Sequence, residues 1–452
     1  MKKTLTILLV LFLIGVVFAG CAKTTGIVSG TVTDKATGKP VPGAAVAIGG
    51  KTATTGSDGK YEVKDVPKGE QTLKITLKGY TDYSEKITVE GGKTITKDVA
   101  LTPVIKIGLV TDVGGRGDKS FNDSALRGLE AWAAGLKMVA GVGYQPLTDD
   151  EYNKSISDEA PDLVGRGIKK FNIEPLVLES KANEDYVPNL KKLADEGAKL
   201  VIGVGFMLTD AIKEVAPQYP NTYFMLIDGV IDPAPSNVVC YTFKEQEGSF
   251  LVGALVGQMT KKNIVGFVGG MDLYIIHKFE YGYRAGVKTV NPKAKVLSGY
   301  TGNFTSADDG QKIAKQQFDA GADIVYHASG ACGIGVIKEA QARGEGYFAV
   351  GVDSDQDYMA PGRVLTSMIK HVDYAVWLSI QSVVEGTFKS GIVSLGVKEG
   401  GVGISPLKYT KNIIPAAVLA KVETLKNMIA NGQIVVPDEK DPFEKFVPPT
   451  LP

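Results

Sequence analysis

Apolar strands alternate with amphipathic helices over most of this chain, and this alternation constrains its fold more than any other feature. From Val104 onward, runs such as IKIGLVTD and KLVIGVG are followed by stretches with helical periodicity, for example Ser124–Leu136 and Tyr186–Glu196. A βαβα alternation indicates parallel sheets covered by helices on both faces. The strands are too numerous for one ordinary doubly wound sheet and lack the regularity of an eightfold barrel. We therefore expect two doubly wound α/β lobes.

The order of the segments predicts how the chain is divided between these lobes. We expect the first lobe to run from about Val104 to Asp232 and the second from about Phe243 to Val352. The remaining part, which includes VLTSMIKHV and a helix over 416–430, should cross back and complete both lobes. The insertion GYQPLTDDEYNKSISDEAPDLVGRG predicts a surface loop with an additional helix.

The segment before this alternation has a different composition. Gly26–Thr102 is rich in Thr, Val, Gly and Lys, and short alternating runs such as IVSGTVTD and QTLKITLKGY are separated by turn signals such as SDG. Short strands with turns at this spacing predict a small all-β sandwich over residues 26–102. Pro103 marks the boundary, so the α/β part should occupy residues 104–452.

The first residues predict an export signal that is not part of the fold. Two lysines precede the apolar run Leu5–Phe18, which is shorter than the ~20 residues that a membrane-spanning helix needs. The run ends in FAGC, which resembles a bacterial lipobox. That resemblance implies a signal peptide over residues 1–20, lipidation of Cys21 and a linker over residues 21–25. Lipid chains would hold the protein at the cell membrane, facing the periplasm or the exterior; a single-span anchor or an ordinary signal is the alternative.

Charge, cysteine and histidine content exclude several functions. Lys+Arg and Asp+Glu both total 50, so the formal net charge is zero, whereas nucleic-acid binding requires a basic surface. No two of the three cysteines have the spacing of a zinc site, and we expect neither a metal nor a cofactor. No G-x-S-x-G nucleophile elbow occurs, the three histidines are far apart, and a hydrogen-bonded structural role is expected for His327. The sequence therefore does not indicate an enzyme.

The residues that follow the predicted strands suggest a binding site instead. Ligands of open parallel sheets bind beyond the carboxyl ends of the strands. Here these ends carry carboxylates, aromatic rings and glycines, at Asp112, Phe206, Asp228, Met271, Asp272, Gly330 and Asp353. Carboxylates accept hydrogen bonds from vicinal hydroxyls, and aromatic rings stack on a planar group. Two facing lobes would thus form a cleft for a neutral polyhydroxy ligand with a flat ring, and would repel a polyanion.

The segment VTDVGGRGDKSFNDS, which follows the first of these strands, contains two misleading signals. GDKS resembles the end of a phosphate-binding loop, but Asp118 separates the glycine from the lysine, and its carboxylate would repel phosphate. The tripeptide RGD is short enough to occur by chance. The informative pair is Phe121-Asn122, an aromatic ring and an amide placed just before a helix.

Several motifs resemble one known family. The letters DKSFNDSALRGLE, VIGVGFMLTDAI, FKEQEGSFLVGALVG, HKFEYGYRAGV, GVDSDQ and VLTSMIKHVDYAV resemble the basic membrane lipoprotein family of ABC-transporter substrate-binding proteins, in particular its purine nucleoside receptors. Gly26–Thr102 resembles the carboxypeptidase regulatory-like domain, which usually serves as a spacer or interaction module. The resemblance implies a type I periplasmic binding protein fold, in which two lobes close by a hinge, preceded by the β-sandwich.

The same resemblance implies roles for individual residues. Phe121 would stack on the purine, Asp353 would bind the ribose hydroxyls, and Lys370 would lie near the same sugar. The other expected ligand contacts, which include a second wall at Phe206 and Asp210, are Asp112, Ser120, Asn122, Phe206, Asp210, Met271, Asp272 and Gly330. The ligand would be a purine nucleoside, the partner an ABC permease, and the protein a monomer.

Two alternatives remain open at this stage. The same fold could bind a sugar or a signalling molecule, as a transport receptor or as a sensor. A protein of a different class, a membrane-anchored interaction or adhesion protein, would use the β-sandwich as its active part.

Overall fold

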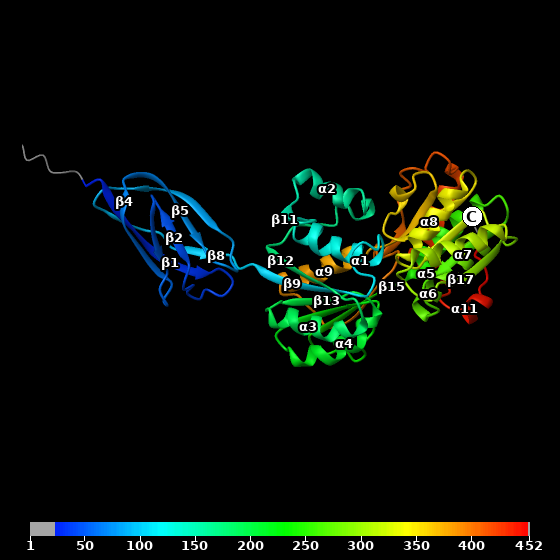
Figure 1. The fold of residues 1–452 in the computed structure, drawn as a ribbon, viewed down its shortest axis with the longest axis horizontal. Helices are drawn as coiled ribbons and strands as arrows, with labels where there is room; N and C mark the ends of the chain where they lie inside the picture. The colour runs from blue at the N-terminus through cyan, green and yellow to red at the C-terminus, as the bar shows by residue number, and fades with distance from the viewer. Residues whose placement is uncertain (1–22, 451–452) are drawn as a thin grey trace, which may run out of the picture. The chain divides into compact units, whose positions relative to one another are not determined.

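The computed structural model describes residues 23–450, and the chain forms two compact units, with the boundary in the sequence between Val104 and Ile105 (Figure 1). The predicted signal peptide over residues 1–20 and Cys21 lie outside the described residues. Strand β1 begins at Thr25, within the predicted linker. Between residues 23 and 450, no helix is both long and apolar enough to cross a membrane.

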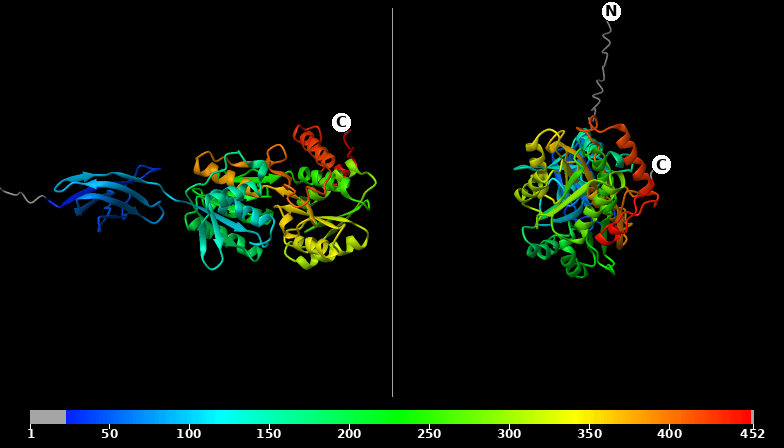
Figure 2. Two further views of the ribbon diagram at one scale, coloured as in Figure 1. Left: turned by 90° about the horizontal axis from the view of Figure 1, so that it is seen from above. Right: turned by 90° about the vertical axis from the view of Figure 1, so that its right-hand side faces the viewer.

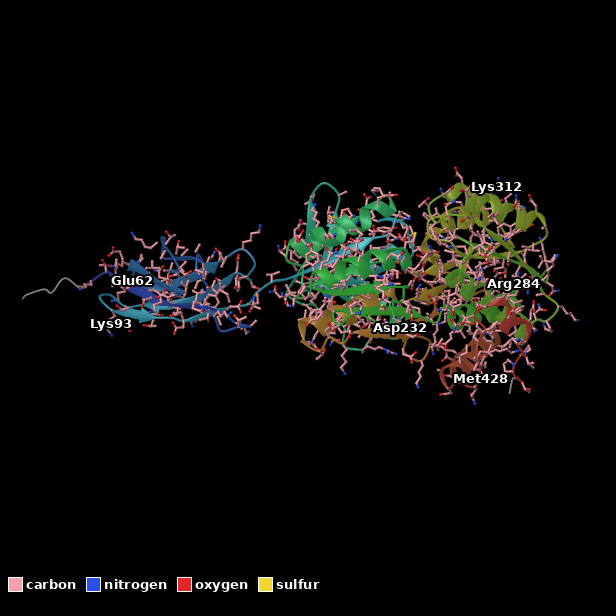
Figure 3. All side chains as sticks on the ribbon, turned by 90° about the horizontal axis from the view of Figure 1, so that it is seen from below. Glu62, Lys93, Asp232, Arg284, Lys312 and Met428 are labelled. Atoms are coloured by element: carbon pink, nitrogen blue, oxygen red, sulfur yellow. The ribbon has the colours of Figure 1, made fainter. Side chains whose placement is uncertain are left out.

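The N-terminal unit consists of two small β-sheets. Strands β4, β1 and β7 form one sheet, in which β8 also pairs with β1, and β3, β2, β5 and β6 form the other. Apolar side chains alternate with exposed polar ones, and the apolar ones, such as Val28, Val46 and Leu73, form a separate core. Exposed charged residues such as Glu62 and Lys93 project outward (Figure 3). The strands are β1 (Thr25–Asp34), β2 (Ala45–Ile48), β3 (Lys51–Thr54), β4 (Lys60–Pro67), β5 (Gly69–Thr76), β6 (Tyr83–Val89), β7 (Thr94–Thr96) and β8 (Val99–Leu101).

The larger unit contains two six-stranded sheets, one in each lobe. The lobe 1 sheet has the order β12-β9-β13-β14-β15-β21, and all its pairings are parallel. The lobe 2 sheet has the order β17-β16-β18-β19-β20-β22, and only β22 runs antiparallel to its neighbour. The strands are β9 (Ile105–Thr111), β12 (Ile173–Glu179), β13 (Leu200–Gly203), β14 (Tyr223–Ile227), β15 (Val238–Phe243), β16 (Ile264–Gly269), β17 (Lys295–Tyr300), β18 (Ile324–Ala328), β19 (Phe348–Asp353), β20 (Val364–Lys370), β21 (Gly391–Leu395) and β22 (Val402–Ile404).

Helices flank these sheets (Figure 2). In lobe 1, α3 and α4 lie on one face of the sheet and α1 and α9 on the other (Figure 1). In lobe 2, α5 packs against α6, α7 packs against α8, and α10 packs against α5. The helices are α1 (Phe121–Arg127), α2 (Asp149–Ser157), α3 (Tyr186–Asp195), α4 (Thr209–Val215), α5 (Glu245–Met259), α6 (Tyr274–Val290), α7 (Ala307–Asp319), α8 (Cys332–Arg343), α9 (Val372–Val384), α10 (Ala416–Ala430) and α11 (Lys440–Glu444).

The chain passes between the lobes three times. It crosses from β15 to α5, returns from β20 to α9, and crosses again between β21 and β22. The two predicted doubly wound lobes are therefore present, and the C-terminal part completes both of them. Strand β15, which lies between the two expected lobe segments, belongs to lobe 1.

Two local features differ from the sequence-based expectation. The helix expected over Ser124–Leu136 begins at Phe121, continues as a π-helical turn over Gly128–Ala133, and stops before Gly135, whose φ of +68° is left-handed. The insertion contains a β-hairpin, β10 (Leu136–Val139) and β11 (Gly143–Pro146), before the expected additional helix α2. The hairpin was missed because its strands have only four residues each and none of these residues is buried.

Candidate ligand-binding site

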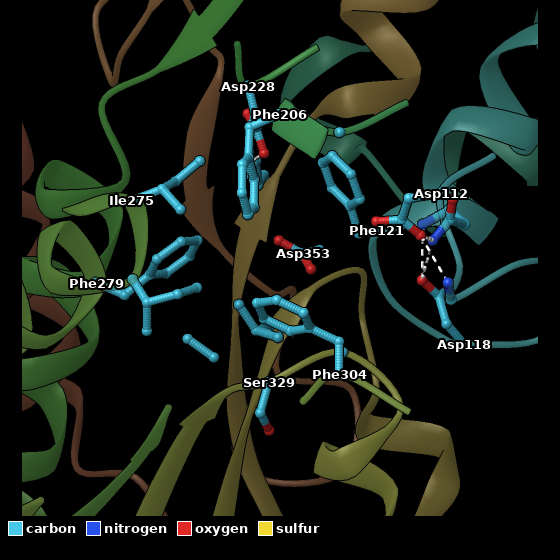
Figure 4. Close-up of a pocket in the computed structure, with 18 residues that line it drawn as sticks. Asp112, Asp118, Phe121, Phe206, Asp228, Ile275, Phe279, Phe304, Ser329 and Asp353 are labelled. Carbon is cyan, nitrogen blue, oxygen red and sulfur yellow. Dashed lines mark hydrogen bonds and ion pairs between the residues drawn. The ribbon is translucent and has the colours of Figure 1, made fainter. Parts of the chain in front are cut away.

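A pocket that is partly open to solvent lies between the lobes at the carboxyl ends of both sheets (Figure 4). The rings of Phe121, Phe206, Phe279 and Phe304 lie around the carboxylate of Asp353. Its lining residues are Asp112, Gly114, Asp118, Phe121, Asn122, Gly205, Phe206, Asp228, Ile275, Ile276, Phe279, Phe304, Ala328, Ser329, Gly330, Val352, Asp353 and Lys370.

A polar turn after β9 places Phe121 at the pocket. The buried carboxylate of Asp118 accepts the backbone N–H groups of Ser120, Asn122 and Asp123 at 2.9, 2.8 and 3.1 Å. It thereby satisfies donors that the first turn of a helix leaves free, and α1 begins at Phe121. Asn122 Nδ2 donates to Asp112 Oδ1 at 2.8 Å and to Asp118 Oδ2 at 3.1 Å. Because both partners are acceptors, the orientation of the Asn122 amide is determined.

Lobe 2 contributes its own strand ends to the pocket. Asp353 ends β19 with a left-handed φ of +64°, and Ser120 Oγ in lobe 1 donates to its carboxylate. Ser329 and Gly330 follow β18. Phe304 reaches the pocket by packing on Gly270, where an added Cβ would lie 2.1 Å from the Phe304 ring. Glycine is therefore required at position 270 if the ring is to keep this place.

Lys370 is a buried cation between the lobes. Its ammonium lies 2.5 Å from Asp228 Oδ2 and 2.9 Å from Glu245 Oε1. It also lies 5.0 Å from the ring centroid of Phe121 and 5.0 Å from that of Phe243, within the range of cation–π attraction. Only 2% of the Lys370 side chain is exposed, so its charge is compensated by neighbouring side chains, Asp353 among them.

The electrostatics of the pocket are acidic. Burial raises the pKa of Asp112 to about 6, and it raises the pKa of Asp353 to about 7 although Lys370 and Ser120 oppose the shift. Burial also raises the pKa of Asp228 to about 6 against the attraction of Lys370. Burial lowers the pKa of Lys370, but the neighbouring carboxylates outweigh it and leave a net increase. Among the described lining residues, four carboxyl groups accompany one ammonium group, an arrangement that favours hydrogen-bond donors over phosphates.

Most of the predicted site residues meet at this pocket. Ser120 does not line the pocket itself, but its hydroxyl donates to the carboxylate of Asp353, which does. The residues that line the pocket itself are Asp112, Phe121, Asn122, Phe206, Gly330, Asp353 and Lys370.

Besides Ser120, three predicted residues do not line the pocket. Asp210 is exposed in the first turn of α4. Met271 and Asp272 lie in the turn after β16, and the Asp272 carboxylate binds His277 Nε2 at 2.6 Å. The carboxyl end of a strand places the first residue after it at the cleft. At this strand, the residues that come next follow the turn away from the cleft. At this strand end, Gly270 supports Phe304 instead.

The structure also adds residues to the predicted set. Asp228, already identified at a strand end, lines the pocket, and Asp118 joins it from the turn before α1. Ile275 and Phe279 are spaced by one helical turn in α6, a signal that also fits simple core packing. Phe304 lies in a loop whose sequence carries no such signal.

The described residues offer no evident chemistry beyond binding. Between residues 23 and 450, no group of His, Cys, Asp and Glu could hold a metal ion. Cys240 and Cys332 are free and buried. The buried His327 donates or accepts a hydrogen bond with Gln356 at 2.9 Å, in keeping with the structural role expected for it.

Both units of the chain are similar to known protein families. The family described as ABC transporter substrate-binding protein PnrA-like matches residues 105–440, and the carboxypeptidase regulatory-like domain matches residues 27–102. Basic membrane protein A1 of Borrelia garinii is 34% identical over 346 residues, covering 76% of this chain and 91% of that protein. The ABC transporter nucleoside-binding protein BmpA of Lactococcus lactis is 32% identical over 351 residues, covering 74% and 90%.

Solved structures show the same fold. A solute-binding protein of an ABC transporter system from Aeropyrum pernix is 28% identical, with a TM-score of 0.60, and the match covers 75% of this chain and 96% of that protein. These relatives are substrate-binding proteins of transporters and not enzymes. The chain belongs to the PnrA-like family of ABC-transporter substrate-binding proteins.

Proposed function

We propose that this substrate-binding protein takes up a purine nucleoside in the interlobe pocket and delivers it to the permease of an ABC importer. The observation that carries this proposal is the combination of phenylalanine rings and buried carboxylates in one pocket. The base would stack on the rings, among them Phe121, and the ribose hydroxyls would donate to Asp353. The relative from Lactococcus lactis, which is named as nucleoside-binding, supports this ligand class.

The charge of the pocket argues against nucleotides. A 5′-monophosphate would bring about two negative charges at neutral pH into a site where four carboxyl groups accompany one lysine among the described lining residues. The ammonium of Lys370 is already paired with Asp228 and Glu245. A neutral nucleoside meets no such repulsion.

We further propose that the protein acts as a monomer held at the cell membrane by lipid on Cys21. The letters FAGC after the apolar run support this anchor. The β-sandwich, which has its own core, would then serve as a spacer or docking module between the anchor and the binding unit.

A ligand panel tests the function. The purified protein is titrated calorimetrically, and its melting temperature measured, with adenosine, guanosine, inosine, uridine, adenine, ribose and adenosine 5′-monophosphate. At least one purine nucleoside should bind with a stoichiometry of about one, and more tightly than ribose, the free base and the monophosphate. Preference for ribose would favour a sugar receptor of the same fold, and binding of none of these compounds would contradict the proposal.

Phe121→Ala should weaken binding of the purine nucleoside by about 1–3 kcal/mol, because a base stacked on an aromatic side chain gains about this much. The dissociation constant would be measured by calorimetry. Phe388→Ala is the matched control, since Phe388 stacks on Tyr223 at 4.1 Å outside the pocket lining. Equal affinities for the two variants would show that Phe121 does not stack on the ligand.

Deletion of residues 26–102 should leave the affinity for the nucleoside within about twofold of the full chain, because every lining residue belongs to the larger unit. Calorimetry of both proteins checks this result. An adhesion or interaction protein that relies on the sandwich would instead lose its binding activity. A large drop in nucleoside affinity would mean that the sandwich contributes to the site.

A further inference from the structure

Gln356 lies behind the pocket and bonds to both lobes, although it does not line the cavity. It follows β19 in lobe 2 and is completely buried. Its Oε1 accepts the backbone N–H of Val352 at 3.0 Å and lies 2.9 Å from His327 Nε2. Its Nε2 donates across the cleft to the backbone carbonyl of Lys119 in lobe 1, at 2.9 Å.

The chemistry of the neighbours determines the orientation of this amide. The Val352 N–H can only donate and the Lys119 carbonyl can only accept, so Oε1 must face Val352 and Nε2 must face Lys119. His327 then carries its proton on Nε2. Burial lowers the pKa of His327 to about 4, so the ring is neutral near pH 7. Every polar atom of the Gln356 side chain is thus used for a specific contact.

The carbonyl that accepts from Gln356 belongs to Lys119, which lies two residues before Phe121 in the sequence. Lys119 has a left-handed φ of +59°, and Ser120 and Phe121 follow it. A conformation of this kind in a non-glycine residue costs energy and persists only when its surroundings hold it. On the lobe 1 side, Asp123 accepts the Lys119 N–H at 3.1 Å. On the lobe 2 side, Gln356 binds the Lys119 carbonyl.

Ser120 makes the other contacts between the lobes at this point. Its hydroxyl donates to Asp353, and Ser354 Oγ donates to its carbonyl at 3.2 Å. Asp353 lines the pocket, so a bound ligand would compete with Ser120 for its carboxylate. The Gln356 contact does not involve a lining group of lobe 2. It joins lobe 2 to lobe 1 outside the lining, so it depends on how the two lobes face each other.

We propose that Gln356 is a positioning residue that latches the closed lobes and, through Lys119, holds Phe121 against the ligand. The proposal rests on the proposed function for the identity of the ligand. In the open form, water can satisfy both Gln356 Nε2 and the Lys119 carbonyl. Without the amide donor, the Lys119 carbonyl loses its partner in this part-buried contact, a cost that falls on the closed form only. The latch therefore favours closure and slows ligand release.

The test removes the Nε2 donor of Gln356 and keeps its Oε1 acceptor. Gln356→Glu retains an oxygen for Val352 and His327 but presents a second oxygen to the Lys119 carbonyl. The matched control is Gln317→Glu, because buried Gln317 donates to the Phe267 carbonyl at 2.8 Å entirely within lobe 2. Dissociation of the purine nucleoside preferred among adenosine, guanosine and inosine is followed by stopped flow, and Gln356→Met repeats the test without a charge.

The distance between the lobes provides a second readout. Spin labels are placed through Lys192→Cys in lobe 1 and Lys312→Cys in lobe 2, since both lysines are exposed (Figure 3 labels Lys312). Native Cys240 and Cys332 are buried. Pulsed electron paramagnetic resonance then reports the closed fraction with and without the nucleoside.

The latch predicts about tenfold faster dissociation for both Gln356 variants, together with a smaller closed fraction. The Gln317 control should dissociate within about twofold of wild type, even if it is less stable. Wild-type dissociation and wild-type interlobe distances in the Gln356 variants would overturn the proposal. If the wild-type protein bound none of the nucleosides, the proposed function would fail, and the distances without nucleoside would still decide the latch.

Discussion

Replacing Lys370 with methionine is expected to destabilise the larger unit by about 3–5 kcal/mol at neutral pH. The Lys370 ammonium lies 2.5 Å from Asp228 Oδ2 and 2.9 Å from Glu245 Oε1. Methionine removes this positive charge and leaves both carboxyl groups buried. Lys278 still pairs with Glu245, but Asp228 loses its cation. Urea unfolding of wild type and variant measures the difference.

The penalty of this substitution should depend on pH. Without Lys370, burial raises the folded-state pKa of Asp228 further above its unfolded value, so the variant loses stability as the pH rises through that range. The deficit should therefore be smaller at pH 5 than at pH 8. Lys315→Met is the control, because Lys315 is a surface partner of Asp319 and its loss should cost at most about 1 kcal/mol. A loss below 1 kcal/mol for Lys370→Met would contradict the central role of this cation.

The second large effect is expected for Asp353→Asn, which should weaken nucleoside binding about 100-fold. A carboxylate accepts hydrogen bonds from hydroxyl groups about twice as strongly as a neutral acceptor, and each such bond to a charged group contributes about 1.5–3 kcal/mol. Asp353 lies at the centre of the pocket (Figure 4). Asp272→Asn is the matched control, since Asp272 lies outside the lining, and it should bind like wild type.

Asp353 should also make binding depend on pH. Its pKa is raised to about 7 by burial, so the group is mostly protonated at pH 6 and mostly ionised at pH 8. Since the ionised form is the better acceptor, wild-type affinity should rise between these two values. Asp112 and Asp228, with pKa values of about 6, complete their ionisation mainly at the lower end of this interval. Calorimetry at pH 6, 7 and 8 should show a shallower slope for Asp353→Asn, and an unchanged slope would assign the titration to another group.

The fold could be predicted from the sequence because parallel α/β lobes have a strong local signature. Buried strands such as β14 and β16 are apolar throughout, and the helices between the strands are periodic. The signature does not tell which sheet a strand joins. Strands β15 and β21 pair with each other across a long sequence separation, and only the tertiary packing assigns both of them to lobe 1.

The site was predictable to the extent that strand ends determine it. Asp112 and Asp353 come directly after or at the end of strands, and both reach the pocket. Asp272 lies in the turn after β16, and Asp210 lies in the first turn of α4. At both positions the local backbone geometry decides the direction of the side chain. Phe304 depends on a loop and on the space above Gly270, which no local pattern reveals.

The most direct test of the central claim is native mass spectrometry of the purified protein in a mixture of ligands. Adenosine, guanosine, inosine, uridine, adenine and ribose are supplied at equal concentrations, and the bound compound is identified by its mass after release. One equivalent of a purine nucleoside is expected on each monomer. Preferential retention of ribose, uridine or the free base, or the absence of any bound ligand, would contradict it.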